Sequence, residues 1–457
     1  MREKQTQQQT SNEAGPLYFT PYTSRFTPYP FHFARLLLVA ALVGAPLAFG
    51  AVVPWAWMAL GLVAALALFL WALGSVQQGK LRIIWSPLYV PLGMFFLLGV
   101  AQYAAWLTLD RSETRQALIL LAVDLAFFFL TIQLFAGVPP WTLYVFGLVV
   151  LAFAGALGLF AILQDTSGAS RIYGVVETPG GALFGPYVNR DHFAGLMEML
   201  IPVAIFSLVG RGGRSSLATS TLCVSAVTLG LASLLLSGSR GGLLALSGEI
   251  AIAAGVLRRA GARTMQRRRL AMAAAFALLA GAMLFAYVDP GWVAKRLGSV
   301  AYVDSTWAEW TGTRQKMARD ALHMWRDHPL LGVGLGDFET AYPRYQSFPS
   351  DEWIDHAHND YVEVLAETGL VGALLILSAL AFFLRLAFRD GGRHIQSQAG
   401  WIRLGATLAC SGMLVHSLLD FNLHIPANAA WFAVLAGIAT AASASDATYD
   451  PLAEAEE

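Results

Sequence analysis

Apolar residues follow one another along this chain in long runs, and short polar segments separate the runs. Each run is roughly 18–24 residues long, and an α-helix needs about 20 apolar residues to cross the hydrocarbon of a bilayer. The pattern therefore predicts an all-α, polytopic transmembrane protein with about twelve spans. Gly50 and Pro54 divide the first long apolar stretch into two spans. The expected spans are 34–52, 54–74, 87–107, 114–136, 142–164, 192–209, 217–236, 240–257, 270–288, 364–386, 401–419 and 427–444.

The composition of the chain agrees with a membrane protein and excludes several other classes. Of its 457 residues, 13 % are charged and 56 % are hydrophobic, whereas soluble chains average roughly 25 % charged residues. So little charge neither covers the surface of a soluble globule nor keeps a chain disordered. A transmembrane β-barrel alternates apolar and polar residues in segments of about ten, and this sequence does not. The formal net charge is zero, so no overall field indicates a nucleic-acid partner.

Basic residues in the loops orient the spans, because Lys and Arg concentrate in cytoplasmic loops. With the N-terminus inside, the inner loops carry most of these residues, including six arginines within 258–269. We interpret those arginines as a topology signal, with a nucleic-acid or anionic-lipid patch as the alternative. The expected organisation is a polar cytoplasmic tail at 1–33, spans one to nine at 34–288, a large outer loop at 289–360, spans ten to twelve at 361–444 and an acidic cytoplasmic tail at 445–457.

Polar and ionisable residues gather at the outer ends of the spans, where the cost of placing them makes them candidates for function. Between spans five and six lie Arg171 and then Asn189, Arg190, Asp191 and His192. Asn189 or Asp191 is expected to cap the sixth span. Capping does not explain the other residues of this cluster, which are therefore candidates for binding.

A glycine-rich turn, SGSRGG, presents Arg240 between spans seven and eight. Its glycines let the backbone approach a ligand closely. A guanidinium offers five donors in a planar fork that fits a phosphate group. The alternative is an arginine that reaches from the helix end to the membrane interface. We expect Arg240 to bind an anion.

The outer loop contains an amphipathic helix from about Gly312 to Asp327, which Pro329 ends. Arg314 lies on the less polar face of this helix, together with Trp325. An arginine is seldom buried without a partner, and the partner is either a bound anion or an acid of the same loop. The GVGLG segment that follows lacks the lysine of a phosphate loop, so it does not indicate nucleotide binding.

The segment DHAHNDYVEVLAETG begins the tenth span. Asp360 and Glu363 fit a capping box at the start of this helix. His358 stands just before the helix at the expected membrane surface, where a neutral imidazole can accept a proton from a hydroxyl. His356 and His358 also raise the question of a metal, but two histidines without a clear third ligand are a weak indication.

A second histidine-containing turn, HSLLDFNLHIPAN, joins the last two spans. His416 and Asp420 are four residues apart, so they are expected to pair on one helical face. The pair serves either the structure alone or the support of a site.

These residues resemble those of the O-antigen ligase and polymerase superfamily, whose members are multi-pass membrane enzymes that handle glycans carried on undecaprenyl diphosphate. The ligase pattern is His, then Asn, Ser or Gln, nine residues, Gly, two residues, and finally Gly, Thr or Tyr. The matching residues of this sequence are His358, Asn359, Gly369 and Gly372.

Other segments carry the same resemblance across spans five to eleven. Ser239, Arg240 and Gly241 match the arginine turn of the family, and HPLLGVGLGDF is similar to the segment leading into its large outer loop helix. The run from Asn189 to His192 departs from the family, where something nearer Asn-Pro-Asn is expected. The roles of Arg190 and His192 are therefore open.

The resemblance implies a GT-C-like fold and a transfer reaction on the periplasmic face of a bacterial inner membrane. The donor would be a glycan on undecaprenyl diphosphate, and the acceptor a lipid A-core or another glycan. Arg240 and Arg314 would bind the diphosphate and stabilise the leaving group, and His358 would activate the acceptor hydroxyl. No metal, ATP or other cofactor is implied, and membrane lipids are the further partner. The residues implied in substrate binding are Arg171, Asn189, Arg190, Asn359, Asp360, Glu363 and Asp420.

Three other functions are compatible with parts of the pattern. The complete histidine motif favours an O-antigen ligase, with a polymerase of lipid-linked repeats as the alternative. Twelve spans also fit a transporter or flippase, but that class predicts an internal repeat and charges near the middle of the membrane. A non-catalytic scaffold of an envelope assembly is the third alternative, and it would leave Arg240, Arg314 and His358 without a role.

Overall fold

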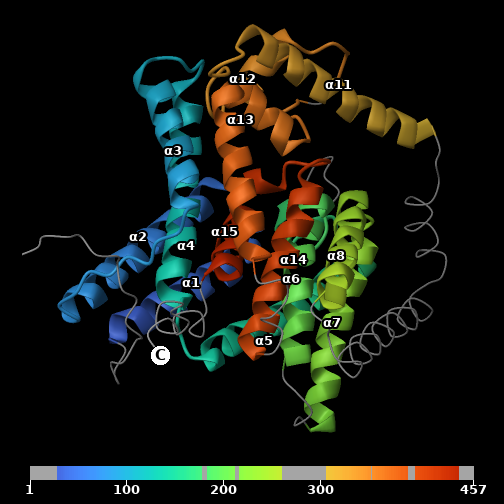
Figure 1. Ribbon diagram of the computed structural model, residues 1–457. Coiled ribbons are helices and arrows are strands. Elements are labelled where there is room, and N and C mark those ends of the chain that lie inside the picture. Colours follow the sequence, from blue (N-terminus) through green and yellow to red (C-terminus); the bar gives the residue numbers. More distant parts are fainter. Residues whose placement is uncertain are drawn as a thin grey trace, which may run out of the picture.

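The computed structural model describes residues 28–177, 183–210, 216–259, 305–350, 353–389 and 397–441, and these are mostly helical (Figure 1). The helices are α1 (Tyr29–Leu47), α2 (Pro54–Gln77), α3 (Tyr89–Ala104), α4 (Arg111–Phe135), α5 (Pro140–Thr166), α6 (Arg190–Gly210), α7 (Leu217–Ser237), α8 (Arg240–Arg259), α11 (Ser305–Asp327), α12 (Phe338–Ala341), α13 (Asp360–Ala387), α14 (Gln398–His416) and α15 (Pro426–Thr440). Short 3-10 turns are η1 (Phe49–Ala51), η2 (Tyr342–Arg344) and η4 (Asn422–His424). A small antiparallel hairpin pairs β1 (Arg171–Ile172) with β2 (Val176–Glu177).

Eight of the described helices are long and apolar enough to cross a membrane, namely α1, α2, α4, α5, α6, α7, α8 and α13. Two further helices, α3 and α15, are apolar but shorter. The chain is thus a polytopic helical membrane protein, as expected. Every expected span overlaps a described helix except 270–288, which lies outside the described residues together with 445–457 and most of 1–33. The exact number of spans and their orientation stay predictions.

The first apolar stretch is divided at the two residues that the sequence indicated. Gly50 adopts a φ of 70° within η1, and α2 begins at Pro54. Glycine takes a positive φ without steric cost, and proline at the first helical position lacks only an N–H that would have no partner there. These two residues turn the chain so that α1 and α2 pack against each other.

The centre of the fold is α6, which packs against α5, α7, α8 and α14. All its side chains from His192 to Ala204 are buried. Trp431 of α15 adds to the core by stacking on Phe153 of α5 at a ring separation of 6.2 Å, and its indole donates a hydrogen bond to Leu42 at 2.7 Å. The first turn of α6, with its polar residues, is therefore held in place from several sides.

A break in α13 lies at Gly369, the first glycine of the histidine motif. Gly369 has φ 63° and ψ −163°, a region of backbone space that is essentially restricted to glycine. Such a break leaves backbone N–H and C=O groups without partners in their own helix. Within a membrane, where no water is present, these groups need hydrogen-bond partners from other segments. The segment after α11 supplies them, because Leu370 N–H donates to Pro329 C=O at 2.9 Å and Val333 N–H donates to Ala366 C=O at 3.0 Å. The glycine-rich segment therefore docks along α13.

We expect Gly369→Ala to lower the free energy of unfolding by at least about 1–3 kcal/mol, because alanine is strained at this φ and ψ. A Cβ at this position would also lie 2.3 Å from the carbonyl carbon of Leu330. The matched control is Gly93→Ala in α3, where a Cβ meets nothing within 4 Å. Thermal unfolding of both purified variants in detergent measures the difference. Equal melting temperatures for the two variants would contradict this account of the break.

The helix α11 extends further toward the N-terminus than expected, to Ser305 rather than Gly312, and it ends at Asp327 as expected. It runs across one end of the helical bundle (Figure 1) and packs against α13. A small apolar core holds α11 and the neighbouring segments together. Its buried residues are Met317, Ala321, Met324, Val333, Phe338, Ala341, Tyr342, Ile354, Ala357 and Ala366. This core holds α11, and with it Arg314, against α13.

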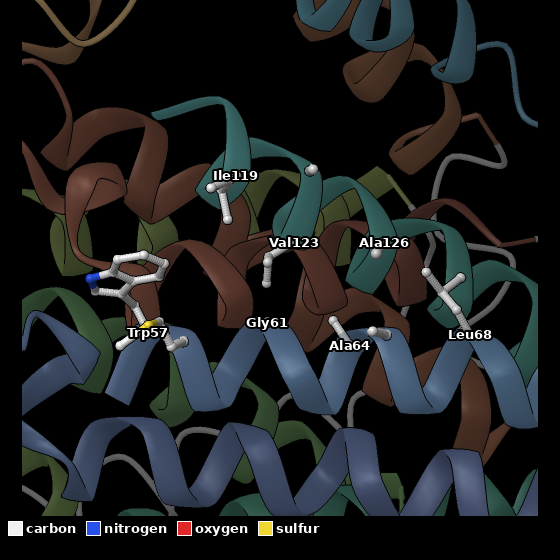
Figure 2. Close-up of a pocket in the computed structure, with 10 residues that line it drawn as sticks. Trp57, Gly61, Ala64, Leu68, Ile119, Val123 and Ala126 are labelled. Atoms are coloured by element: carbon white, nitrogen blue, oxygen red, sulfur yellow. The ribbon is translucent and has the colours of Figure 1, made fainter. Parts of the chain in front are cut away.

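An apolar groove with a volume of about 400 Å³ lies between α2 and α4 (Figure 2). Trp57, Ala64 and Leu68 line it from α2, and Ile119 and Val123 line it from α4. Because both helices are long and apolar enough to cross a membrane, we expect lipid chains to fill this groove. It shares no lining residue with the polar cluster described next.

Candidate active site

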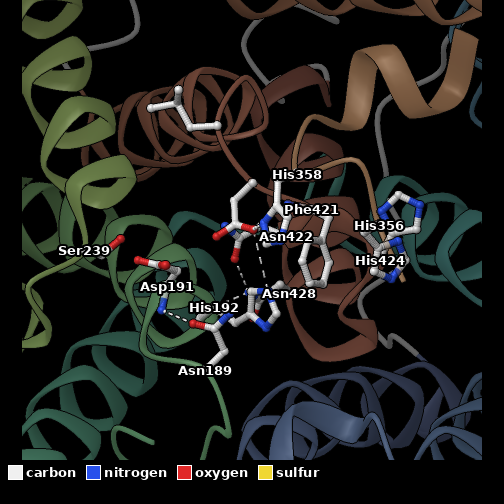
Figure 3. Close-up of polar contacts among 12 residues, drawn as sticks. Asn189, Asp191, His192, Ser239, His356, His358, Phe421, Asn422, His424 and Asn428 are labelled. Atoms are coloured by element: carbon white, nitrogen blue, oxygen red, sulfur yellow. Dashed lines mark hydrogen bonds and ion pairs between the residues drawn. The ribbon is translucent and has the colours of Figure 1, made fainter. Parts of the chain in front are cut away.

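Polar side chains from five separate segments of the chain meet in one cluster (Figure 3). The segments are the start of α6, the start of α8, the helix α11, the segment before α13, and the turn between α14 and α15. Figure 3 shows His192 from α6 close to His358 and to the ring of Phe421. The sequence placed candidates on each of these segments, and the fold brings most of them together.

His358 is oriented by a buried carboxylate. Its Nδ1 lies 3.0 Å from Oδ1 of Asp420. Because a carboxylate accepts hydrogen bonds, the ring hydrogen belongs on Nδ1 and the lone pair on Nε2. The side chain of Asp420 is 1 % exposed, whereas that of His358 is 21 % exposed. His358 also has a φ of 50°, which is uncommon for a residue other than glycine. An imidazole held in this way is suited to accept a proton.

Arg314 lies between two carboxylates of other segments. Its Nη2 is 3.6 Å from Oδ2 of Asp191 and 3.9 Å from Oδ2 of Asp420, and its Nη1 donates to the carbonyl of Leu419. Asp191 and Asp420 lie outside residues 289–360, the loop in which the sequence suggested an acidic partner for Arg314. Both separations are longer than the about 2.7–2.9 Å of a close charge-assisted hydrogen bond.

The first residues of α6 and α8 add two more cations. Asn189 caps α6, because its Oδ1 accepts the N–H of Asp191 at 2.8 Å, which leaves the carboxylate of Asp191 to other partners. Arg190 and Arg240 begin α6 and α8, and the charge of Arg240 interacts with those of Arg190 and Asp191. Asp191 thus interacts with Arg240 and Arg314 and follows Arg190 in the chain. The N-terminus of each of the two helices adds partial positive charge.

The cationic surroundings also act on Asp420. Burial by itself raises the pKa of this carboxyl, but the hydrogen bond with His358 and the charges of Arg314 and His192 outweigh it, and the net pKa lies far below its ordinary value. Asp420 is therefore ionised at any physiological pH. A buried anion of this kind is stable only while its cationic and hydrogen-bonding partners stay in place.

Asn359, rather than Asp360, caps α13. Its Oδ1 accepts the N–H groups of Tyr361 and Val362, both at 3.1 Å. The capping box expected from Asp360 and Glu363 is therefore wrong, because the helix begins one residue earlier than such a box requires. The two carboxylates are left to bond other residues.

Asp360 and Glu363 both bond histidines. His424 Nδ1 lies 3.0 Å from Oδ1 of Asp360, and its Nε2 lies 3.3 Å from Oε1 of Glu363. His356 Nδ1 lies 2.6 Å from the same Glu363 oxygen. Burial alone lowers the pKa of His424, but Glu363 and Asp360 raise it to about 10. Burial and Glu363 oppose each other in the same way at His356, whose net pKa is raised.

His416 does not pair with the side chain expected from its spacing. Its Nδ1 lies 2.9 Å from Oε2 of Glu198 in α6, and both side chains are buried. Between His416 and Asp420 the structure shows a backbone hydrogen bond of 3.1 Å instead. The helix α14 ends at His416, so the rule for side chains four apart on a helix does not apply to Asp420.

Arg171 is the expected binding residue that lies apart from the others. It belongs to β1 and forms an ion pair with Glu177 of β2, and both side chains are about half exposed or more. No contact within the described residues joins it to His358 or Arg314. The expected residues that lie in or beside the cluster are Asn189, Arg190, Arg240, Arg314, His358, Asn359, Asp360, Glu363 and Asp420.

Sequence reasoning missed Phe421, whose ring is the packing surface for three histidines. The ring separations are 4.2 Å to His356, 4.6 Å to His192 and 4.9 Å to His358. A single aromatic residue in a turn between two spans gives no signal of this role in the sequence.

A buried amide network beneath the cluster was also missed. Asn428 of α15 accepts a hydrogen bond from the hydroxyl of Tyr187 at 2.9 Å. Its amide nitrogen donates to the carbonyl of His192 at 2.9 Å and to Oδ1 of Asn422 at 3.0 Å. The signal that points to this network is Asn428 itself, a polar residue within an apolar run.

Comparison with known proteins gives two findings. Residues 225–377 match the family model described as O-Antigen ligase. The chain is also similar to the teichuronic acid biosynthesis protein TuaE of Bacillus subtilis (strain 168), with 29 % identity over 105 residues, which cover 23 % of this chain. The matched segment is 21 % of that relative, so the chain spans about a fifth of its length.

The matched domain contains Arg240, Arg314 and His358, the three residues expected to be catalytic. Their partners Asp191 and Asp420 lie outside it in sequence and meet it through the fold.

Proposed function

From the O-antigen ligase family domain at residues 225–377, we propose that the chain is a bacterial membrane glycosyltransferase that acts on a lipid-linked glycan. The donor is a glycan on undecaprenyl diphosphate, and the acceptor is a hydroxyl on the periplasmic face of the inner membrane. In the finer proposal the enzyme is an O-antigen ligase whose acceptor is lipid A-core. In this proposal both chain termini are cytoplasmic, and residues 289–360 form a periplasmic loop.

The observation that carries this proposal is the pairing of His358 with Asp420 next to a group of arginines. A transfer to a hydroxyl needs a group that accepts a proton and a group that stabilises the departing diphosphate. The cluster offers both within one site, since Arg314 shares Asp420 with His358. An apolar bundle lies beneath the cluster, which suits a substrate anchored by a long polyprenyl chain.

His358 acts as the general base in this proposal. Its Nε2 takes the proton of the acceptor hydroxyl while the acceptor oxygen forms a bond to the anomeric carbon of the donor. The bond between that carbon and the diphosphate oxygen breaks, and undecaprenyl diphosphate leaves with the electron pair. Asp420 keeps the ring of His358 oriented and stabilises the imidazolium that forms, through the hydrogen bond of 3.0 Å to Nδ1.

The arginines bind the diphosphate and stabilise its developing charge. Arg240 and Arg314 interact with Asp191, Arg190 precedes Asp191 in the chain, and Arg314 also pairs with Asp420. The three arginines therefore outnumber the two carboxylates. The guanidinium fork fits phosphate oxygens in a bidentate manner. The net positive charge of these side chains attracts the anionic diphosphate.

A polymerase is the second candidate, and one observation favours it. The relative of this chain is named for teichuronic acid biosynthesis, so a segment similar to this one serves a product other than O-antigen. In that case the acceptor is the hydroxyl of another lipid-linked repeat, and the roles of His358 and Arg314 are unchanged.

Deletion of the gene in its own host tests the proposal, with gel profiles of surface polysaccharide and of extracted lipid-linked glycan. Loss of long surface chains with long polymer on the lipid carrier supports the ligase. Single repeats on the carrier, or a single repeat on the core, support the polymerase. The wild-type gene supplied on a plasmid is the control and restores the profile. Unchanged profiles together with a solute defect would contradict both and point to a transporter.

A further inference from the structure

A second group of side chains lies on the other face of Phe421 from His358 and His192 (Figure 3). His356 stacks on the Phe421 ring, and the ring of His424 lies 4.5 Å from that of His356. Both imidazoles face Glu363. These three residues come from the segment before α13, from η4 and from the first turn of α13, and the proposed transfer reaction requires no such trio.

The ligating atoms of this trio lie close to one another. His356 Nδ1 lies 2.6 Å and His424 Nε2 lies 3.3 Å from Oε1 of Glu363, and a ligand atom from each residue lies within 4.8 Å of the others. Ligands of a tetrahedral Zn²⁺ site, with bonds of roughly 2.0–2.2 Å, are roughly 3.3 Å apart. The His424 separation already has this value, and that of His356 needs to open by less than an ångström.

The surroundings of the trio provide the second observation. A histidine that binds a metal almost always donates its other ring N–H to a carboxylate or carbonyl. His424 has this arrangement, because its Nδ1 lies 3.0 Å from Oδ1 of Asp360 while its Nε2 faces Glu363. Zn²⁺ would replace the proton on that Nε2, because histidine binds a metal as the neutral imidazole. The second oxygen of Glu363 accepts the N–H of Ala357 at 2.7 Å. The orientation of both side chains is thus set before any ion arrives.

We propose that His356, Glu363 and His424 bind a Zn²⁺ ion, with Asp360 holding His424 in the orientation that binding needs. Two imidazoles and one carboxylate suit zinc, whereas Mg²⁺ and Ca²⁺ prefer oxygen ligands alone. The side chains of His356 and His424 are 24 % and 30 % exposed, so an ion has a path to the site and a water has room in the fourth position.

Such an ion is structural in this proposal and does not contact the reacting atoms. It would tie the segment before α13 to η4 and to α13 itself. That segment carries His358 in its uncommon positive φ, so the ion would hold the backbone two residues from the proposed base. Zinc binding does not rest on the proposed function, because it is measured without any glycan substrate.

The test uses the full chain, purified in detergent without a polyhistidine tag and stripped of metal by a chelator. Zn²⁺ is titrated in competition with a chromophoric chelator, and bound zinc is counted by elemental analysis. We expect a single tight Zn²⁺ per chain. His356→Ala and His424→Ala each remove a ligand, so we expect each to weaken zinc binding by at least about 100-fold. Asp360→Asn changes a supporting residue, so we expect it to weaken zinc binding by only about 10–100-fold.

His323→Ala is the matched control, because His323 is an exposed histidine of α11 outside the trio. It should bind zinc as the wild type does. Melting temperatures separate binding from misfolding, since Zn²⁺ should raise the melting temperature of the wild type and of His323→Ala but not of His424→Ala. Asp360→Asn keeps both histidines, so its weaker zinc binding tests the proposal if the alanine variants do not fold. The proposal would be overturned if the variant that carries both His356→Ala and His424→Ala bound zinc with the affinity and stoichiometry of the wild type. It would also be overturned if the wild type bound no zinc.

Discussion

Replacing His358 by alanine is expected to lower glycan transfer by about 10²–10⁴-fold, the usual contribution of a positioned general base. The physical reason is the loss of the proton acceptor that Asp420 orients from 3.0 Å away. The measurement is the amount of transferred polymer in the deletion strain that carries the variant gene, at matched protein levels in the membrane.

His323→Ala is the control for this experiment as well, because it removes an exposed histidine of α11 and leaves the cluster intact. The affinity for lipid-linked donor should change little in His358→Ala, because His358 acts on the acceptor side. Transfer at the wild-type rate in His358→Ala would mean that another group accepts the proton, and the base assignment would be wrong.

The second large effect is expected at Arg314. Arg314→Lys keeps the positive charge but loses the planar fork that contacts Asp191, Asp420 and the Leu419 carbonyl together. Because preorganised donors aimed at a leaving group are worth about 10²–10³-fold in rate, we expect transfer to fall by about 10²-fold. The measurement is the kinetics of transfer in reconstituted membranes with varied concentrations of the lipid-linked donor.

Arg319→Lys is the matched control, since Arg319 lies on the same helix and is exposed. A role in binding the diphosphate predicts that Arg314→Lys changes kcat and the KM for donor, while the KM for acceptor stays the same. An unchanged rate and donor KM in Arg314→Lys would exclude a contact with the diphosphate. A loss that follows only from lower protein in the membrane would mark Arg314 as structural.

The agreement between sequence and structure is closest where the relevant property is local. The divided first stretch at Gly50 and Pro54, the apolar helices and the end of α11 at Asp327 follow from hydropathy, helix period and residues with special backbone preferences. The candidates at the ends of spans were found in the same way, because ionisable residues stand out beside apolar runs.

The two wrong predictions, the capping box and the His416–Asp420 pair, concern contacts that depend on the tertiary structure. The spacing of Asp360 and Glu363 fits a capping box, and that of His416 and Asp420 fits a pair on one helical face. Each rule holds only if the helix includes the residues in question. The helix α13 begins after Asn359, and α14 ends at His416, so each side chain found a partner from another segment.

By itself, then, the sequence determined that this is a helical membrane protein with polar segments between its apolar runs, and it identified the histidine and arginines that belong to the matched domain. Only the tertiary structure decided which charges meet. His358 and Asp420 are 62 residues apart in the chain, and His416 and Glu198 are 218 residues apart. Such pairs form because the packing of α6, α11, α13 and the 417–424 turn buries the carboxylates of Asp420 and Glu198. A buried charge is stable only beside a partner, and the fold brings that partner from a distant segment.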